Sequence, residues 1–135
     1  MPPFRLQRRV DFCDTDLVGI VHFANFFRYM ETAEVAFLKS RGLNVNLEWN
    51  GEKIGFPRVS VTCDYVSPAK FDELLDIDVR LERLGGKSVT YAFEFSRDGT
   101  PLAHGKMTSV CCRVGKDHKL EAIDIPPDIR ERIQR

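Results

Sequence analysis

The chain of 135 residues has no net charge, because twenty Lys and Arg residues are balanced by twenty Asp and Glu residues. A neutral chain has no long-range attraction for nucleic acid or for an anionic membrane surface, so we expect neither as a partner. The sequence also lacks a run of eighteen apolar residues, and its first residues, Met-Pro-Pro-Phe-Arg, have no apolar core typical of a signal peptide. We therefore expect a cytoplasmic protein without a membrane-spanning segment.

Cysteine is scarce and follows no ligand pattern. None of the cysteines forms a Cys-x-x-Cys pair or lies beside a histidine at ligand spacing, and each falls in a predicted strand. The four are Cys13, Cys63, Cys111 and Cys112. We expect them to be reduced and structural, and we expect no metal and no redox cofactor.

What is present is a pattern of one long helix among several strands. Apolar and polar residues alternate over 4–12, and an apolar stripe from Phe26 to Phe37 with helical spacing predicts a helix over 25–41. Further alternation predicts four strands, over 59–65, 75–81, 89–95 and 102–114. Residues 44–55 are expected to be an irregular connection, and Pro126-Pro127 is expected to begin a short charged helix.

Turn signals then predict how the strands pair. Gly85-Gly86 and Asp98-Gly99 are typical of tight turns, so the last three strands are expected to form an antiparallel meander. The order of elements predicts an α+β fold, with one domain spanning residues 1–135. A single sheet on a single helix leaves sheet edges to be protected, and dimerisation is one solution.

The segment from Arg9 to Tyr29 is the most informative about chemistry. Two carboxylates, Asp14 and Asp16, precede a turn at Gly19, and the predicted helix follows. This order places an acidic side chain at a helix N-terminus, where backbone N–H groups carry partial positive charge. A carboxylate that attacks or activates water, beside amides that hold a developing oxyanion, can hydrolyse an ester or thioester.

This segment resembles the hot-dog-fold acyl-CoA thioesterases, in particular the 4-hydroxybenzoyl-CoA thioesterase-like branch. The similarity continues in Gly-Phe-Pro-x-Val-Ser over 55–60 and in Tyr-Val-Ser-Pro-Ala-x-Phe-Asp-Glu-Leu over 65–74, and its most specific part is Asp-Thr-Asp-x-x-Gly-Ile-Val-x-aromatic over 14–23. The resemblance implies a five-stranded antiparallel sheet wrapped around one long central helix, with a short C-terminal helix. It also implies a homodimer or homotetramer with active sites at the subunit interface.

The resemblance also implies roles for individual residues. Asp16 matches the catalytic carboxylate, and the backbone N–H of Phe23 matches the group that polarises the thioester carbonyl. Asp16 would act as a general base on water or as a nucleophile through a mixed anhydride, and the sequence leaves both routes open. The expected substrate contacts are Gly19, Val21, His22 and Lys87. No cofactor is implied beyond the coenzyme A of the acyl-CoA substrate.

Two positions depart from the family pattern. Relatives often carry histidine at the position of Phe23, whereas here the histidine is His22, one residue earlier. The basic loop that grips the nucleotide end of coenzyme A in some members is reduced to residues 84–88, where Lys87 is the matching cation and Arg83 lies nearby.

Other interpretations stay open at this point. Asp16 could simply cap the following turn, Asp14 is expected to shape that turn, and Glu31 on the helix is a secondary candidate for the catalytic carboxylate. The function could instead be that of a hot-dog hydratase or dehydratase acting on acyl thioesters, or of a non-catalytic acyl-CoA-binding protein.

Overall fold

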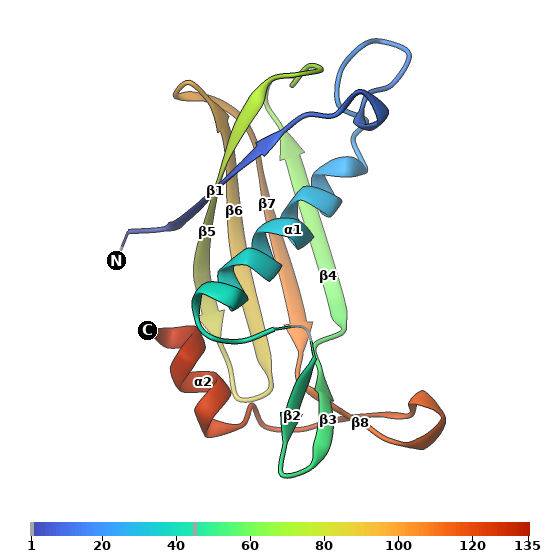
Figure 1. Cartoon of the computed structure of the whole chain (residues 1–135), viewed down its shortest axis with the longest axis vertical. Coiled ribbons are helices and arrows are strands. Elements are labelled where there is room, and N and C mark those ends of the chain that lie inside the picture. The colour runs from blue at the N-terminus through green and yellow to red at the C-terminus, as the bar shows by residue number, and fades with distance from the viewer. Residues whose placement is uncertain (1, 45) are drawn as a thin grey trace.

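A computed structural model describes residues 2–44 and 46–135, and its main feature is a five-stranded antiparallel sheet crossed by a helix. The strands in sheet order are β1 (Phe4–Arg9), β5 (Leu74–Leu84), β6 (Ser88–Arg97), β7 (Thr100–Val110) and β4 (Arg58–Tyr65). Helix α1 (Asn25–Ser40) lies across one face of this sheet (Figure 1).

The core fills the space between α1 and the sheet. The apolar stripe of α1 faces the inward side chains that alternate along the strands. The apolar residues of the helix and of the strands therefore pack into one core. The largest fully buried side chains include Tyr29, Tyr91, Phe93 and Phe95. Gly105 on β7 permits this close packing, because a Cβ there would collide with the side chain of Met30 on α1.

A second, four-stranded sheet lies at one end of the molecule, and the sequence pattern did not predict it. It contains β2 (Leu47–Trp49), β3 (Glu52–Gly55), β8 (Cys112–Val114) and β9 (Leu120–Ala122). The expectation that 44–55 is irregular is therefore wrong for β2 and β3, which form a hairpin. These strands are too short to show alternation, and the hairpin is stabilised by pairing of β3 with β8, a strand distant in sequence.

The strand expected over 102–114 is divided between the two sheets. At Cys111 the backbone changes partners, since its N–H donates to the carbonyl of Lys87 at 2.7 Å and its own carbonyl accepts from Ile123 at 2.9 Å. Residues before this point form β7 and residues after it form β8. The prediction of one continuous strand is wrong because apolar patterning does not report which neighbour a strand pairs with.

Several local predictions are confirmed. The mixture of helix and antiparallel sheet is confirmed, and β5, β6 and β7 form the expected meander. A short C-terminal helix, α2 (Pro127–Gln134), begins with proline in its first turn. The first strand ends at Arg9, and two 3₁₀ turns occur, η1 (Phe12–Asp14) and η2 (Lys116–His118), so Cys13 lies in a turn and not in a strand.

No helix among the described residues combines the length and the apolar character needed to cross a lipid bilayer.

Candidate functional site

The loop between η1 and α1 is closed by its own backbone. The N–H of Asp16 donates to the carbonyl of Ile20 at 2.9 Å, and the N–H of Gly19 donates back to the carbonyl of Asp16 at 3.0 Å. Gly19 has a φ of +90°, a conformation that side chains other than glycine rarely adopt. The glycine is therefore required by the turn that presents Asp16.

The carboxylate of Asp16 combines a local hydrogen bond with access to a groove. Its Oδ1 accepts a hydrogen bond from the N–H of Val18 at 2.9 Å, which fixes its direction. Among the described residues, no donor bonds the other oxygen, Oδ2. The side chain is partly exposed and lines a groove of about 500 Å³. The turn-capping role is thus observed, and it leaves one oxygen available for chemistry.

The groove brings together two parts of the chain. One wall comes from the loop and the start of α1, and the other comes from the end of β4 and the segment after it. The lining residues are Asp16, Ile20, Val21, Phe23, Phe26 and Tyr65–Ala69. Most of these side chains are apolar, so the groove offers an apolar bed beside one carboxylate.

One amide at the entrance of α1 stands out as unoccupied. Within the described residues 21–27, every backbone N–H has a hydrogen-bond acceptor except that of Phe23. The engaged amides are those of Val21, His22, Ala24, Asn25, Phe26 and Phe27. Phe23 is 62% exposed and lines the groove with Asp16. Its N–H can therefore donate to a ligand carbonyl at the positive end of the helix dipole.

Asp14 is a structural residue that ties the loop to α1. Its carboxylate accepts hydrogen bonds from the Tyr29 hydroxyl at 2.8 Å and from the N–H of Asp11 at 3.1 Å. Burial alone would raise the pKa of Asp14, but these bonds and the nearby charge of Arg8 outweigh it and lower the pKa below its ordinary value. Burial, followed by the hydrogen bond to Asp14, raises the pKa of Tyr29. The expected role of Asp14 in shaping the turn agrees with these bonds.

Tyr65, the last residue of β4, is a site residue that the sequence interpretation did not single out. Its hydroxyl donates to the carbonyl oxygen of Phe23 at 2.9 Å, and its ring packs edge-on against Phe26. Burial, followed by the effect of Cys63, raises the pKa of Tyr65 to about 12, so the hydroxyl keeps its proton at neutral pH. The signal for Tyr65 was its place in the 65–74 motif.

The other expected substrate contacts are dispersed. Val21 lines the groove, whereas Gly19 and His22 are exposed and are not among its lining residues. The ring of His22 stacks on that of Phe23, with centroids 4.7 Å apart, and its Nδ1 accepts from the N–H of Ala24 at 3.3 Å. His22 therefore supports the conformation of the helix entrance.

Lys87 lies at the opposite end of the sheet from Asp16. It follows β5, whose eleven residues span roughly 35 Å at about 3.3 Å per residue, and the Asp16 loop lies at the other end of the sheet (Figure 1). Its ammonium pairs with the carboxylate of Asp124 at 2.8 Å. Within one chain, the structure does not bring Lys87 to the groove.

A possible cation-binding group is already engaged. Asp11, Cys13 and Asp14 place one ligand atom each within 4.8 Å of one another. The Asp14 carboxylate is held by Tyr29 and by a backbone amide, and the other two side chains are exposed.

Comparison with known proteins finds similar sequences and similar structures. The family described as the thioesterase-like superfamily matches residues 10–133. The 4-hydroxybenzoyl-CoA thioesterase of Pseudomonas sp. strain CBS-3 is 27% identical over 133 residues, covering 93% of this chain and 94% of the relative. Its crystal structure has a TM-score of 0.84, with 98% of this chain and 99% of that chain covered.

Two further relatives extend the comparison to other aroyl thioesters. The 1,4-dihydroxy-2-naphthoyl-CoA hydrolase of Prochlorococcus marinus strain MIT 9313 is 27% identical over 121 residues, covering 84% of this chain and 80% of the relative. The structure of the gentisyl-coenzyme A thioesterase BH1999 has a TM-score of 0.83 and 30% identity, covering 94% of this chain and 99% of that chain. These relatives are thioesterases, and the structural neighbours have the hot-dog fold.

Proposed function

Because the chain belongs to the thioesterase-like superfamily, we propose that it hydrolyses an acyl-CoA thioester to a free acid and coenzyme A. One observation carries the proposal. Asp16, which has one free carboxylate oxygen, and Phe23, whose N–H is unoccupied, line the same apolar groove. A thioester carbonyl bound between them would have a nucleophile or base on one side and an oxyanion donor on the other.

Two routes are chemically compatible with this geometry. Asp16 can remove a proton from a water that attacks the carbonyl carbon, or it can attack that carbon itself and form a mixed anhydride that water then hydrolyses. In both routes the carbonyl oxygen gains negative charge and the Phe23 amide stabilises it. The leaving group is a thiol whose pKa resembles that of cysteine, about 8.5, so it departs as a thiolate with little help from an acid.

The acyl group is proposed to occupy the apolar part of the groove. Phe23, Phe26 and Tyr65 give it aromatic walls, which suit an aromatic or medium-length aliphatic acyl group. The names of the relatives, which include 4-hydroxybenzoyl-CoA and gentisyl-CoA thioesterases, favour the aromatic class. We expect the reaction to take place in the cytoplasm, since all four cysteines are free.

We further propose that two copies associate through β4. This strand ends the five-stranded sheet order, and its outer edge has no strand partner among the described residues. Val59 and Val61 on β4 are exposed apolar residues, 62% and 39% accessible. An unpaired edge of eight residues invites pairing with another strand, and a second copy of β4 closes it in an antiparallel, two-fold arrangement.

A dimer of this kind also decides where Lys87 can act. Lys87 follows β5, at the end of the sheet opposite the Asp16 loop (Figure 1). Antiparallel pairing of two copies through β4 brings this end of one copy beside the Asp16 end of the other. Any contact of Lys87 with a coenzyme A phosphate at the Asp16 groove therefore has to cross the dimer interface.

The experiment that tests the function is an acyl-CoA panel, aromatic against straight-chain, with release of free thiol followed by a thiol reagent. A thioesterase releases one thiol per acyl group hydrolysed. A hydratase or dehydratase releases none, and a binding protein shows thermal stabilisation by acyl-CoA without turnover. Absence of thiol release with every substrate would overturn the proposal.

A further inference from the structure

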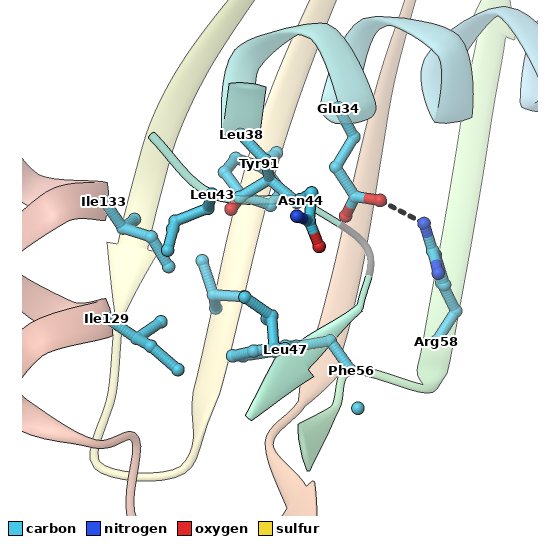
Figure 2. A pocket seen from close by; sticks show the side chains of 12 residues that line it. Glu34, Leu38, Leu43, Asn44, Leu47, Phe56, Arg58, Tyr91, Ile129 and Ile133 are labelled. Atoms are coloured by element: carbon cyan, nitrogen blue, oxygen red, sulfur yellow. Dashed lines mark hydrogen bonds and ion pairs between the residues drawn. The ribbon is translucent and has the colours of Figure 1, made fainter. Parts of the chain in front are cut away.

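A second pocket lies near the C-terminal half of α1, and its polar groups have no role in the site described above. Its walls are mainly apolar and come from α1, the segment after it, β6 and α2, as Figure 2 shows. The polar side chains at the pocket are Glu34, Asn44, Arg58 and Tyr91. Its internal volume is about 70 Å³, room for roughly two water-sized groups. It can therefore hold the end of a larger molecule.

The carboxylate in this pocket is unusually buried for a charged group, whereas its partner Arg58 is 38% exposed. Glu34 reaches from α1 to Arg58 at the start of β4, and its side chain is only 6% exposed (Figure 2). Burial raises the pKa of Glu34 although Arg58 opposes the shift. Desolvating this carboxylate is costly, so its burial needs a reason beyond stability.

Within one chain this pocket cannot serve the Asp16 groove. Glu34 follows Phe23 by eleven residues along α1, roughly 16 Å at about 1.5 Å per residue. The helix between them packs on the sheet through Phe26 and Met30, which are buried. An acyl group at Phe23 would have to pass through the packed core to reach Glu34.

The proposed dimer removes this obstacle. Two edge strands of one sheet that pair antiparallel are related by a two-fold axis perpendicular to the sheet, so both α1 helices stay on the same face. The rotation places the Arg58 end of β4 beside the Tyr65 end of its copy. Arg58 belongs to the second pocket and Tyr65 to the Asp16 groove, so the groove of one copy meets the second pocket of the other.

We propose that the Glu34–Arg58 pocket of one copy receives the far end of the acyl group whose thioester lies at Asp16 of the other, and that it selects acyl groups ending in a neutral hydroxyl. The proposal rests on the proposed thioesterase function and dimer. A hydroxyl can donate to the Glu34 carboxylate and accept from the Arg58 guanidinium, so it replaces water at both groups. An acyl group that ends in a methyl or a bare ring edge gives Glu34 and Arg58 no hydrogen-bond partner. An acyl group that ends in a carboxylate is repelled by Glu34.

Matched substrate pairs test the selection. Benzoyl-CoA against 4-hydroxybenzoyl-CoA, and hexanoyl-CoA against 6-hydroxyhexanoyl-CoA, differ only in the terminal hydroxyl. We expect the wild type to prefer the hydroxylated member of at least one pair by tenfold or more in kcat/KM. The double variant Glu34→Leu with Arg58→Met replaces the ion pair by apolar groups. Its ratio of kcat/KM for the hydroxylated over the unhydroxylated substrate should be at least about tenfold smaller than that of the wild type.

The preference is a ratio within one variant, so it does not depend on how much of the protein is folded and active. Should the double variant fail to fold, Glu34→Gln keeps the size and one acceptor, and its preference should fall in between. The double variant Glu82→Leu with Lys106→Met removes an exposed ion pair of 2.9 Å and serves as the control with an unchanged ratio.

Mixed dimers test whether the pocket acts across the interface. One copy carries Asp16→Asn and the other carries the Glu34–Arg58 double variant. The only intact Asp16 then faces the intact pocket of the first copy, so the wild-type preference should return. The inference is overturned if the preference for the hydroxylated substrate stays lost in the mixed dimer, or if the double variant never lost it. Thiol release by the wild type would still support the proposed function in either case. Absence of thiol release from the wild type with every substrate would overturn both.

Discussion

The hydroxyl of Tyr65 donates a hydrogen bond to the carbonyl oxygen of Phe23 at 2.9 Å, so the end of β4 holds the residue whose own N–H is free. The two residues are 42 positions apart in sequence. This bond connects the sheet edge proposed for dimerisation with the amide proposed to stabilise the oxyanion.

Tyr65→Phe removes that bond and keeps the ring. A neutral hydrogen bond contributes about 0.5–1.5 kcal/mol, so kcat should fall by about twofold to tenfold if the Phe23 amide loses its orientation. Steady-state kinetics with thiol detection measures the change, and the thermal unfolding midpoint reports whether the fold is intact. An unchanged kcat would show that Phe23 is oriented by the loop alone.

Asp16→Asn should lower kcat by at least about a hundredfold, because the amide is neither a base nor a nucleophile. The fold should persist, since the asparagine oxygen can still accept from the N–H of Val18. Asp98→Asn is the matched control at the turn between β6 and β7, where φ is +49° and asparagine is tolerated. Near-normal turnover of the Asp16 variant would remove this carboxylate from the mechanism.

Asp14→Asn should destabilise the protein by about 1–3 kcal/mol at neutral pH, because the Tyr29 hydroxyl and the Asp11 amide lose a charged acceptor. The folded protein lowers the pKa of Asp14, so its contribution is complete above the ordinary value of 3.8 and is lost as the pH falls through the lowered folded value. Urea unfolding at neutral pH and at about pH 3 should show the difference between wild type and variant shrinking toward the acid side. A difference that grows on acidification would contradict this sign.

Gly19→Ala should reduce both stability and turnover. The φ of +90° costs alanine about 1 kcal/mol, although nothing lies within 4 Å of the added Cβ, so the loss comes from backbone strain and not from a clash. Gly115→Ala is the control, because φ there is −90° and the Cβ would make an ordinary contact at 3.5 Å. Equal effects of the two substitutions on kcat would mean that the turn before α1 has no special role.

Val61→Lys should convert the proposed dimer to a monomer, since it places a charge on the unpaired edge strand β4. Sedimentation velocity measures the change, and activity should fall with the dimer fraction. Leu120→Lys changes a residue of β9 that is 51% exposed, and it should leave the assembly intact. A monomer with full activity would contradict a site completed by the second copy.

Patterns among residues close in sequence were enough to predict the helix, the meander and the turn that presents Asp16. Each depends on neighbours in sequence: the apolar period of the Phe26–Phe37 stripe, the Asp98-Gly99 turn, and the freedom of Gly19 to adopt a positive φ. The assignment of Asp16 as the catalytic group depended on family resemblance and stays a prediction.

Only the tertiary structure decided which distant groups meet. The bond from Tyr65 to Phe23, the burial of Glu34 against Arg58 and the change of sheet at Cys111 all join residues that no periodic pattern relates. Periodicity encodes which face of an element is apolar, and it contains no information about which partner covers that face. The sequence by itself therefore determined the long helix, the meander and the acidic turn, whereas the packing of β4 against the helix entrance decided the groove.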